Sequence, residues 1–174
     1  MLRRCHAYRE RLITFSPLTF PPLHTIYLSL GTNIGHRRRN ISRAIQKIGE
    51  QVGAVVRQSA LYETEPWGFR TARRFVNAAV CVETELSPHE LLLATQAIEQ
   101  QMGRTHKTRK GTDALPVEGT TYQDRVIDID ILLYDDLTLS DPDLQIPHPL
   151  MLERDFVMKP LSEILDSLPA SLQK

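Results

Sequence analysis

The stretch RVIDIDILLYDD, residues 125–136, has the alternating apolar pattern of a β-strand but carries two aspartates near its middle. Asp128 and Asp130 lie two positions apart, and isoleucines flank them on both sides. Because side chains alternate between the two faces of a strand, both carboxylates share one face and the isoleucines share the other. The stretch therefore predicts a strand with a core on one face and a polar site on the other.

The segments before this strand predict the rest of the fold. Gly53 and Gly103 end two helical stripes of apolar residues, and Ser87, Pro88 and Glu90 form a capping box at the start of the second helix. Strands are predicted at residues 26–30, 55–64, 75–84 and 126–134, helices around 41–52 and 88–102, and short helical pieces from 149 onward.

The order β-α-β-β-α-β is that of a ferredoxin-like sandwich, an α+β fold. We expect an antiparallel sheet with both helices on one face and the active site on the other. An open doubly wound sheet would need more helices, and an all-β barrel would need fewer.

Length and composition favour one soluble domain. A chain of 174 residues is long enough for a single sizeable core, and residues 26–174 are expected to form it. Residues 1–25 contain four arginines and three prolines without a clear period. A signal peptide needs an uninterrupted apolar run, so this segment is predicted to be a poorly ordered leader.

Charge and cysteine content limit the class of partner. The 21 basic and 21 acidic residues cancel, so no global field favours nucleic acid or an anionic membrane. No apolar stretch approaches the ~20 residues that span a bilayer. Cys5 and Cys81 are predicted to be free thiols, which favours a reducing compartment. We therefore expect a cytoplasmic monomer with small-molecule partners.

The aspartate pair points to a metal. Residues i and i+2 of a strand lie ~6.6 Å apart at the backbone, where two carboxylates repel by roughly 2.5 kcal/mol at an effective dielectric of 20. A divalent cation would reverse the sign of this interaction. Mg²⁺ prefers hard oxygen ligands and often takes one or two carboxylates together with substrate phosphates. Asp128 and Asp130 are therefore candidate magnesium ligands.

A solvated strand face without function would also explain a bare Asp-x-Asp pair, since short motifs match by chance. Two neighbouring segments favour the metal site: IPHPLMLERDF, with His148 and Arg154, and YETEPWGF, with its aromatic loop. A third feature is a set of basic residues before the strand. These are Arg104, His106, Lys107, Arg109, Lys110 and Arg125. Together these features suggest a polyphosphate and a flat ring held side by side.

Five motifs in register resemble one known family. YLSLGTNIG, YETEPWGF…FVNAAV, TQAIEQQMGR, RVIDIDILLY and IPHPLMLERDFVMKPL occur in the order typical of the 6-hydroxymethyl-7,8-dihydropterin pyrophosphokinases of folate biosynthesis. The resemblance covers the chain from about residue 26 to its C-terminus. It implies transfer of pyrophosphate from ATP to the hydroxymethyl group of the pterin, with release of AMP. It also implies two Mg²⁺ ions along the triphosphate.

The resemblance carries over to individual positions. It implies catalytic roles for Arg104, Arg125, Asp128 and Asp130, with both aspartates as metal ligands. It implies ATP contacts by Gln96, Glu99, Arg104, Lys107, Arg125, Ile131, His148 and Arg154. It implies pterin contacts by Thr64, Pro66, Trp67, Phe75, Asn77 and Phe156. The chain departs from the family pattern at Phe75, where tyrosine is frequent, and at His106, where arginine is common.

Simpler roles remain open for several of these residues. Phe75 and Phe156 could be core aromatics, and Gln96 and Glu99 could be solvated helix positions. Asn77 is harder to dismiss, because strands are depleted in asparagine. Two other functions also remain open. A metal-dependent nucleotidyl transferase of palm or cyclase type would turn over nucleotide without pterin, and a non-catalytic ligand-binding module would need no magnesium.

Overall fold

The computed structural model describes residues 21–67, 71–104 and 124–172, without the side chain of residue 171. Its main sheet is antiparallel, in the order β2-β4-β1-β5, and β3 pairs with β4 beyond the end of β2. The strands are β1 (His24–Thr32), β2 (Ala54–Gln58), β3 (Tyr62–Thr64), β4 (Phe75–Thr84) and β5 (Asp128–Tyr134), with a small hairpin of β6 (Leu139–Ser140) and β7 (Gln145–Ile146). The helices are α1 (Arg37–Gln51), α2 (Pro88–Gln101), α3 (Asp155–Ser162) and the short turns η1 (Met151–Glu153) and η2 (Ala170–Leu172).

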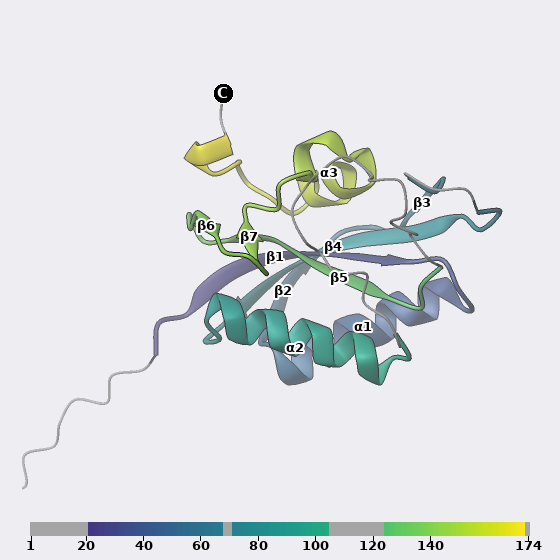
Figure 1. Ribbon diagram of the computed structural model, residues 1–174, viewed down its shortest axis with the longest axis horizontal. Helices are drawn as coiled ribbons and strands as arrows, with labels where there is room; N and C mark the ends of the chain where they lie inside the picture. The colour runs from purple at the N-terminus through teal and green to yellow at the C-terminus, as the bar shows by residue number, and fades with distance from the viewer. Residues whose placement is uncertain (1–20, 68–70, 105–123, 173–174) are drawn as a thin grey trace, which may run out of the picture.

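The two long helices cover one face of the sheet, as predicted (Figure 1). Their buried side chains pack on the aliphatic faces of β1, β4 and β5 and form the larger core. In α2 the predicted capping box is confirmed, because Glu90 accepts hydrogen bonds from the main-chain N–H of Ser87 at 2.9 Å and from its hydroxyl at 2.6 Å. No helix of the described ranges is both long and apolar enough to cross a membrane.

The alternation of faces along β5 is confirmed as far as Ile131. There the register with β1 shifts, since Tyr27 pairs with Leu133 while Leu28 pairs with Ile131. Leu132 is the extra residue of this bulge, so Leu132 and Leu133 both belong to the second core, on the opposite face from the larger one. Strict alternation would have placed Leu133 in the larger core.

The strand predicted at residues 55–64 is interrupted. The hydroxyl of Ser59 accepts a 2.9 Å hydrogen bond from the main-chain N–H of Ala79, in place of a main-chain carbonyl. The N–H of Ser59 donates to the carbonyl of Ala79 at 3.0 Å. The ladder therefore ends at β2 and starts again at β3, and both short strands lie along β4.

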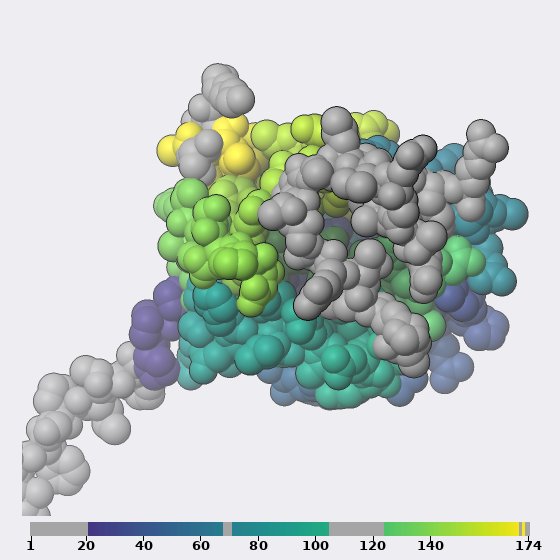
Figure 2. All heavy atoms as spheres, in the orientation of Figure 1, coloured from purple at the N-terminus to yellow at the C-terminus, as the bar shows by residue number. Residues whose placement is uncertain are grey.

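The opposite face of the sheet was predicted to be free of helices, and this prediction is incomplete. α3 packs on one part of that face above the second core, which includes Tyr27, Cys81, Val157 and Leu161. Figure 1 shows α3 on the side of the sheet opposite to α1 and α2. In the space-filling view, α2 forms the lower edge of the visible surface and α3 lies at its upper edge (Figure 2). Only the rest of this face is left for a site.

The first strand starts earlier than predicted. β1 begins at His24, whose Nδ1 atom lies 2.7 Å from a carboxylate oxygen of Asp135. The main-chain N–H of Thr25 donates to the same carboxylate at 2.7 Å. Most of the predicted leader, residues 1–20, lies outside the described residues, as does Cys5. Cys81 is a buried free thiol.

Candidate active site

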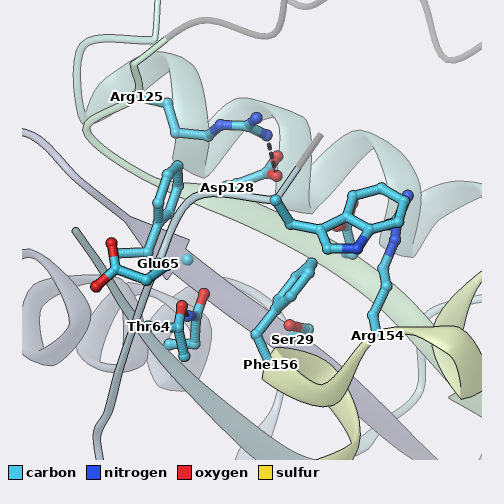
Figure 3. A pocket seen from close by; sticks show the side chains of 12 residues that line it. Ser29, Thr64, Glu65, Arg125, Asp128, Arg154 and Phe156 are labelled. Carbon is cyan, nitrogen blue, oxygen red and sulfur yellow. Dashed lines mark hydrogen bonds and ion pairs between the residues drawn. The ribbon is translucent and has the colours of Figure 1, made fainter. Parts of the chain in front are cut away.

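A pocket opens on the sheet face that α3 leaves uncovered (Figure 3). It lies over the polar ends of β1, β4 and β5, next to the loop after β3 and the start of α3. Its lining residues are Ser29, Gly31, Thr64, Glu65, Trp67, Phe75, Asn77, Arg125, Asp128, Asp130, Arg154 and Phe156. Segments that are distant in the sequence thus meet on the part of this sheet face that α3 does not cover.

Asp128 and Asp130 both line this pocket. In the β1–β5 ladder they pair with Gly31 and Ser29, which line it too. Arg104 and Arg125 each donate to Asp128, one to each carboxylate oxygen. The aspartate pair therefore points away from the helix-packed core, as the alternation predicted.

Arg104 forms a buried ion pair with Glu99. Its Nη1 atom lies 2.5 Å from Oε1 of Glu99, and the two side chains are only 9% and 2% exposed. Burial alone would lower the pKa of Arg104, but the charges of Asp128 and Glu99 outweigh it, so the pKa is raised. Glu99 also accepts from the main-chain N–H of Ile129 at 2.8 Å. Glu99 therefore orients Arg104, and its predicted contact with ATP stays a prediction.

Aromatic rings and arginines line two sides of the pocket. The rings of Trp67 and Phe156 are tilted by 54° with centroids 6.2 Å apart. The guanidinium of Arg154 lies 4.7 Å from the ring centroid of Trp67, and that of Arg125 lies 5.9 Å from the centroid of Phe75. Figure 3 shows Arg154 and Phe156 across the pocket from Arg125 and Asp128. These sides offer flat apolar surface with positive charge at its edges.

Asn77 lies at the floor of the pocket on β4. It is buried, and its amide donates to the hydroxyl of Thr64 at 2.8 Å across the β3–β4 pair. Its Oδ1 atom lies over Gly31, where an added Cβ atom would be only 3.0 Å away. A buried amide has both donor and acceptor atoms, so it can match the mixed edge of a heterocyclic ring.

The residues present fit a magnesium site. Two carboxylates share one face of β5, and no cluster of three or more His, Cys, Asp or Glu side chains suited to a metal occurs in the described part of the chain. The protein thus supplies two hard oxygen groups and leaves further coordination positions to water and ligand phosphates, which is the usual pattern for Mg²⁺.

Six of the predicted ligand contacts that the structure describes are not lining residues of this pocket: Pro66, Gln96, Glu99, Arg104, Ile131 and His148. The side chain of Ile131 belongs to the larger core. The main-chain N–H of His148 donates to the carbonyl of Leu132 at 2.9 Å. Lys107 lies outside the described residues.

Sequence reasoning missed three lining residues, Ser29, Gly31 and Glu65. Ser29 shares the strand face of Tyr27, so its place in the alternation was a usable signal. Gly31 was expected to end the strand, but β1 continues to Thr32. Its role follows from the close approach of Asn77, which only the paired register reveals.

Comparison with known proteins agrees with this geometry. The family model of the 7,8-dihydro-6-hydroxymethylpterin-pyrophosphokinases (HPPK) matches residues 27–166. The chain belongs to the HPPK family. Its relatives include the 2-amino-4-hydroxy-6-hydroxymethyldihydropteridine pyrophosphokinase of Porphyromonas gingivalis, 44% identical over 140 residues that make up 80% of this chain and 89% of the relative. The enzyme of that name from Bacillus subtilis is 38% identical over 139 residues, 79% of this chain and 76% of the relative.

Solved structures support the fold. A crystal structure of a Plasmodium falciparum HPPK-DHPS triple mutant superposes with a TM-score of 0.65 at 16% sequence identity, covering 87% of this chain and 42% of the other. Another HPPK-DHPS crystal structure, in complex with substrates, gives a TM-score of 0.59 at 16% identity, with 82% and 40% covered. The chain thus spans about two fifths of these larger proteins. HPPK family membership does not favour the nucleotidyl transferase or the non-catalytic module.

Proposed function

We propose that the protein transfers pyrophosphate from ATP to 6-hydroxymethyl-7,8-dihydropterin in folate biosynthesis. The hydroxyl oxygen of the pterin bonds to the β-phosphorus, the bond from the β-phosphorus to the α–β bridging oxygen breaks, AMP leaves, and the hydroxyl proton is released. The observation that carries the proposal is a single pocket that combines an aspartate pair, arginines, aromatic rings and a buried amide. HPPK family membership supports the same reaction.

On the phosphate side, Asp128 and Asp130 would hold Mg²⁺ bound to the triphosphate. A bound cation would neutralise phosphate charge and lower the pKa of the attacking hydroxyl. Arg104 and Arg125 both donate to Asp128. Guanidinium donors suit phosphate oxygens equally well, so these arginines exchange a carboxylate partner for phosphate when the nucleotide binds.

On the pterin side, Asn77 and Thr64 recognise the polar edge of the ring, and the aromatic residues hold its faces. Phe75 enters from the start of β4, whereas Phe156 and Trp67 approach from α3 and from the loop after β3. A ring bound here has its hydroxymethyl group within the same pocket as the aspartates. Because both reactants are held in one pocket, the loss of entropy needed to bring the hydroxyl group to the phosphate is smaller.

The finer features of the enzyme are also part of this proposal. We expect two Mg²⁺ ions per active site, a monomeric protein and a cytoplasmic location. Residues 26–174 would carry the whole reaction as one domain. Gln96, Glu99, Lys107, Ile131 and His148 are retained as candidate nucleotide contacts, and Pro66 as a candidate pterin contact.

The direct experiment mixes the purified protein with MgATP and the hydroxymethyl dihydropterin and separates AMP and pterin products by chromatography. AMP and the pyrophosphorylated pterin should form in equal amounts, and neither should form when the pterin or the magnesium is omitted. Release of free pyrophosphate without pterin would indicate a nucleotidyl transferase, and AMP release without pterin would indicate a nucleotide hydrolase. Binding without AMP release would indicate the non-catalytic module.

A further inference from the structure

Asn33 contacts Arg125 from outside the pocket. It follows β1 directly and is only 3% exposed. Its main-chain N–H donates to the carbonyl of Arg125 at 3.1 Å, and its side-chain Oδ1 accepts from the main-chain N–H of Arg125 at 2.8 Å. Both polar main-chain groups of this arginine are therefore bound by one asparagine, 92 residues earlier in the chain.

The amide nitrogen of Asn33 fixes the neighbouring residue as well. It donates to Oδ1 of Asp124 at 2.7 Å, and Oδ2 of Asp124 accepts from Arg73 at 2.9 Å. Asn40 donates to the carbonyl of Val126 at 3.2 Å, on the other side of Arg125. A buried amide is costly unless its groups are bonded, and Asn33 uses both polar ends of its side chain on one short segment.

This segment leads directly into the catalytic machinery. The guanidinium of Arg125 donates to Asp128 (Figure 3). It also lies over the ring of Phe75. It therefore bridges the phosphate side and the ring side of the pocket. A shift of the Arg125 main chain would carry its donors away from both, and displacements of about 1 Å can cost up to about 100-fold in rate.

We propose that Asn33 is a positioning residue for Arg125, and that it sets the rate of the reaction by holding the Arg125 main chain at the end of β1. The inference rests on the proposed pyrophosphate transfer. It assigns Asn33 no contact with either substrate. Its effect should therefore appear in kcat, with little change in the KM for the pterin.

The test uses a charge swap between Asn33 and Asp124. Asn33→Asp keeps the acceptor for the Arg125 N–H but places two carboxylates side by side, and should lower kcat at least about tenfold. The double variant Asn33→Asp with Asp124→Asn restores one amide and one carboxylate with the direction of donation reversed. It should recover kcat to within about threefold of the wild type, while the KM for the pterin stays within about threefold throughout.

Two further variants separate positioning from general stability. Arg73→Gln removes the other partner of Asp124 and should leave kcat unchanged. In an Arg125→Ala background, Asn33→Asp should have little further effect on kcat, because the group that it positions is gone. Thermal melts of every variant confirm folding. Asn33→Ser, which introduces no charge, replaces Asn33→Asp if the latter does not fold.

Several results would overturn the proposal. They are wild-type kcat in folded Asn33→Asp and Asn33→Ser, no recovery in the swapped protein, or an equal loss of kcat with and without the Arg125 side chain. Fast hydrogen exchange at the Arg125 amide of the wild type would also overturn it, without any variant. Failure of the proposed function is distinct, since the wild type itself would then release no AMP.

Discussion

Glu99 accepts a 2.5 Å hydrogen bond from Arg104, and the two side chains are each at least nine-tenths buried. The pair lies behind Asp128, to which Arg104 also donates. Glu99 is not among the described residues that line the pocket. We expect it to affect the reaction through the arginine that it orients.

Glu99→Gln should lower both stability and turnover. The substitution removes the negative charge that offsets the buried guanidinium of Arg104, and we expect a loss of about 1–3 kcal/mol in the free energy of unfolding. Turnover should fall because Arg104 is no longer oriented. Urea unfolding and AMP release measure the two effects. The exposed Glu85→Gln is the matched control and should change stability by less than about 0.5 kcal/mol. Unchanged turnover in Glu99→Gln would contradict the orienting role.

Gly31→Ala should weaken pterin binding. Its new Cβ atom would lie 3.0 Å from Oδ1 of Asn77, so the buried amide must shift from its place in the pocket floor. We expect the Kd for the pterin to rise about tenfold, equal to about 1.4 kcal/mol, as measured by calorimetry. Gly49→Ala on α1 is the control, because nothing lies within 4 Å of its added Cβ atom. Equal pterin affinity in both variants would mean that Asn77 does not contact the pterin.

Trp67 is the single tryptophan of the chain and lines the pocket, so its emission reports on ligands there. Titration with the pterin should quench this emission. Arg154→Ala removes the cation that lies 4.7 Å from the indole ring and should weaken pterin binding roughly threefold to tenfold. Trp67→Phe keeps an aromatic wall and removes the signal. If saturating pterin leaves the emission unchanged, the ring binds elsewhere.

The capping box of α2 predicts a pH-dependent contribution to stability. Hydrogen bonds from the hydroxyl and main-chain N–H of Ser87 lower the pKa of Glu90 below its usual value. This contribution is present above the pKa of Glu90 in the unfolded chain, and it is lost as the pH falls through the lower pKa of the folded state. Ser87→Ala should cost about 1 kcal/mol at neutral pH. The difference in the free energy of unfolding between variant and wild type, measured by urea unfolding, should become smaller at low pH. A difference in this free energy that does not change with pH would contradict the role of Glu90.

The sequence predicted the faces of the strands because burial on one side imposes a period of two. It failed where the ladder itself changes. The bulge at Leu132 places two successive leucines on one face, and the hydroxyl of Ser59 replaces a main-chain carbonyl. The bulge and the Ser59 hydrogen bond both depend on the neighbouring strand, so the apolar pattern of a single strand does not predict them.

In the candidate site too, some residues could be predicted from the sequence pattern, and others depend on tertiary contacts. Asp128, Asp130 and Asn77 could be found because polar residues interrupt an apolar strand pattern, and Trp67 because an aromatic residue stands in a loop between strands. Glu99 was assigned to the ATP site by the family resemblance, and helix spacing did not reveal that it is buried beside Arg104. The contacts of Asn33 with residues 124–125 join segments about 90 residues apart, so no local pattern records them.

The most direct test of the account measures AMP release as a function of magnesium in the wild type and in Asp128→Asn and Asp130→Asn. Both side chains line one pocket, and each substitution keeps the size of the side chain while removing its charge. We predict that turnover falls at least about 100-fold in each variant, with circular dichroism and melting curves showing a folded protein. Near-normal, magnesium-dependent AMP release in either folded variant would contradict the account.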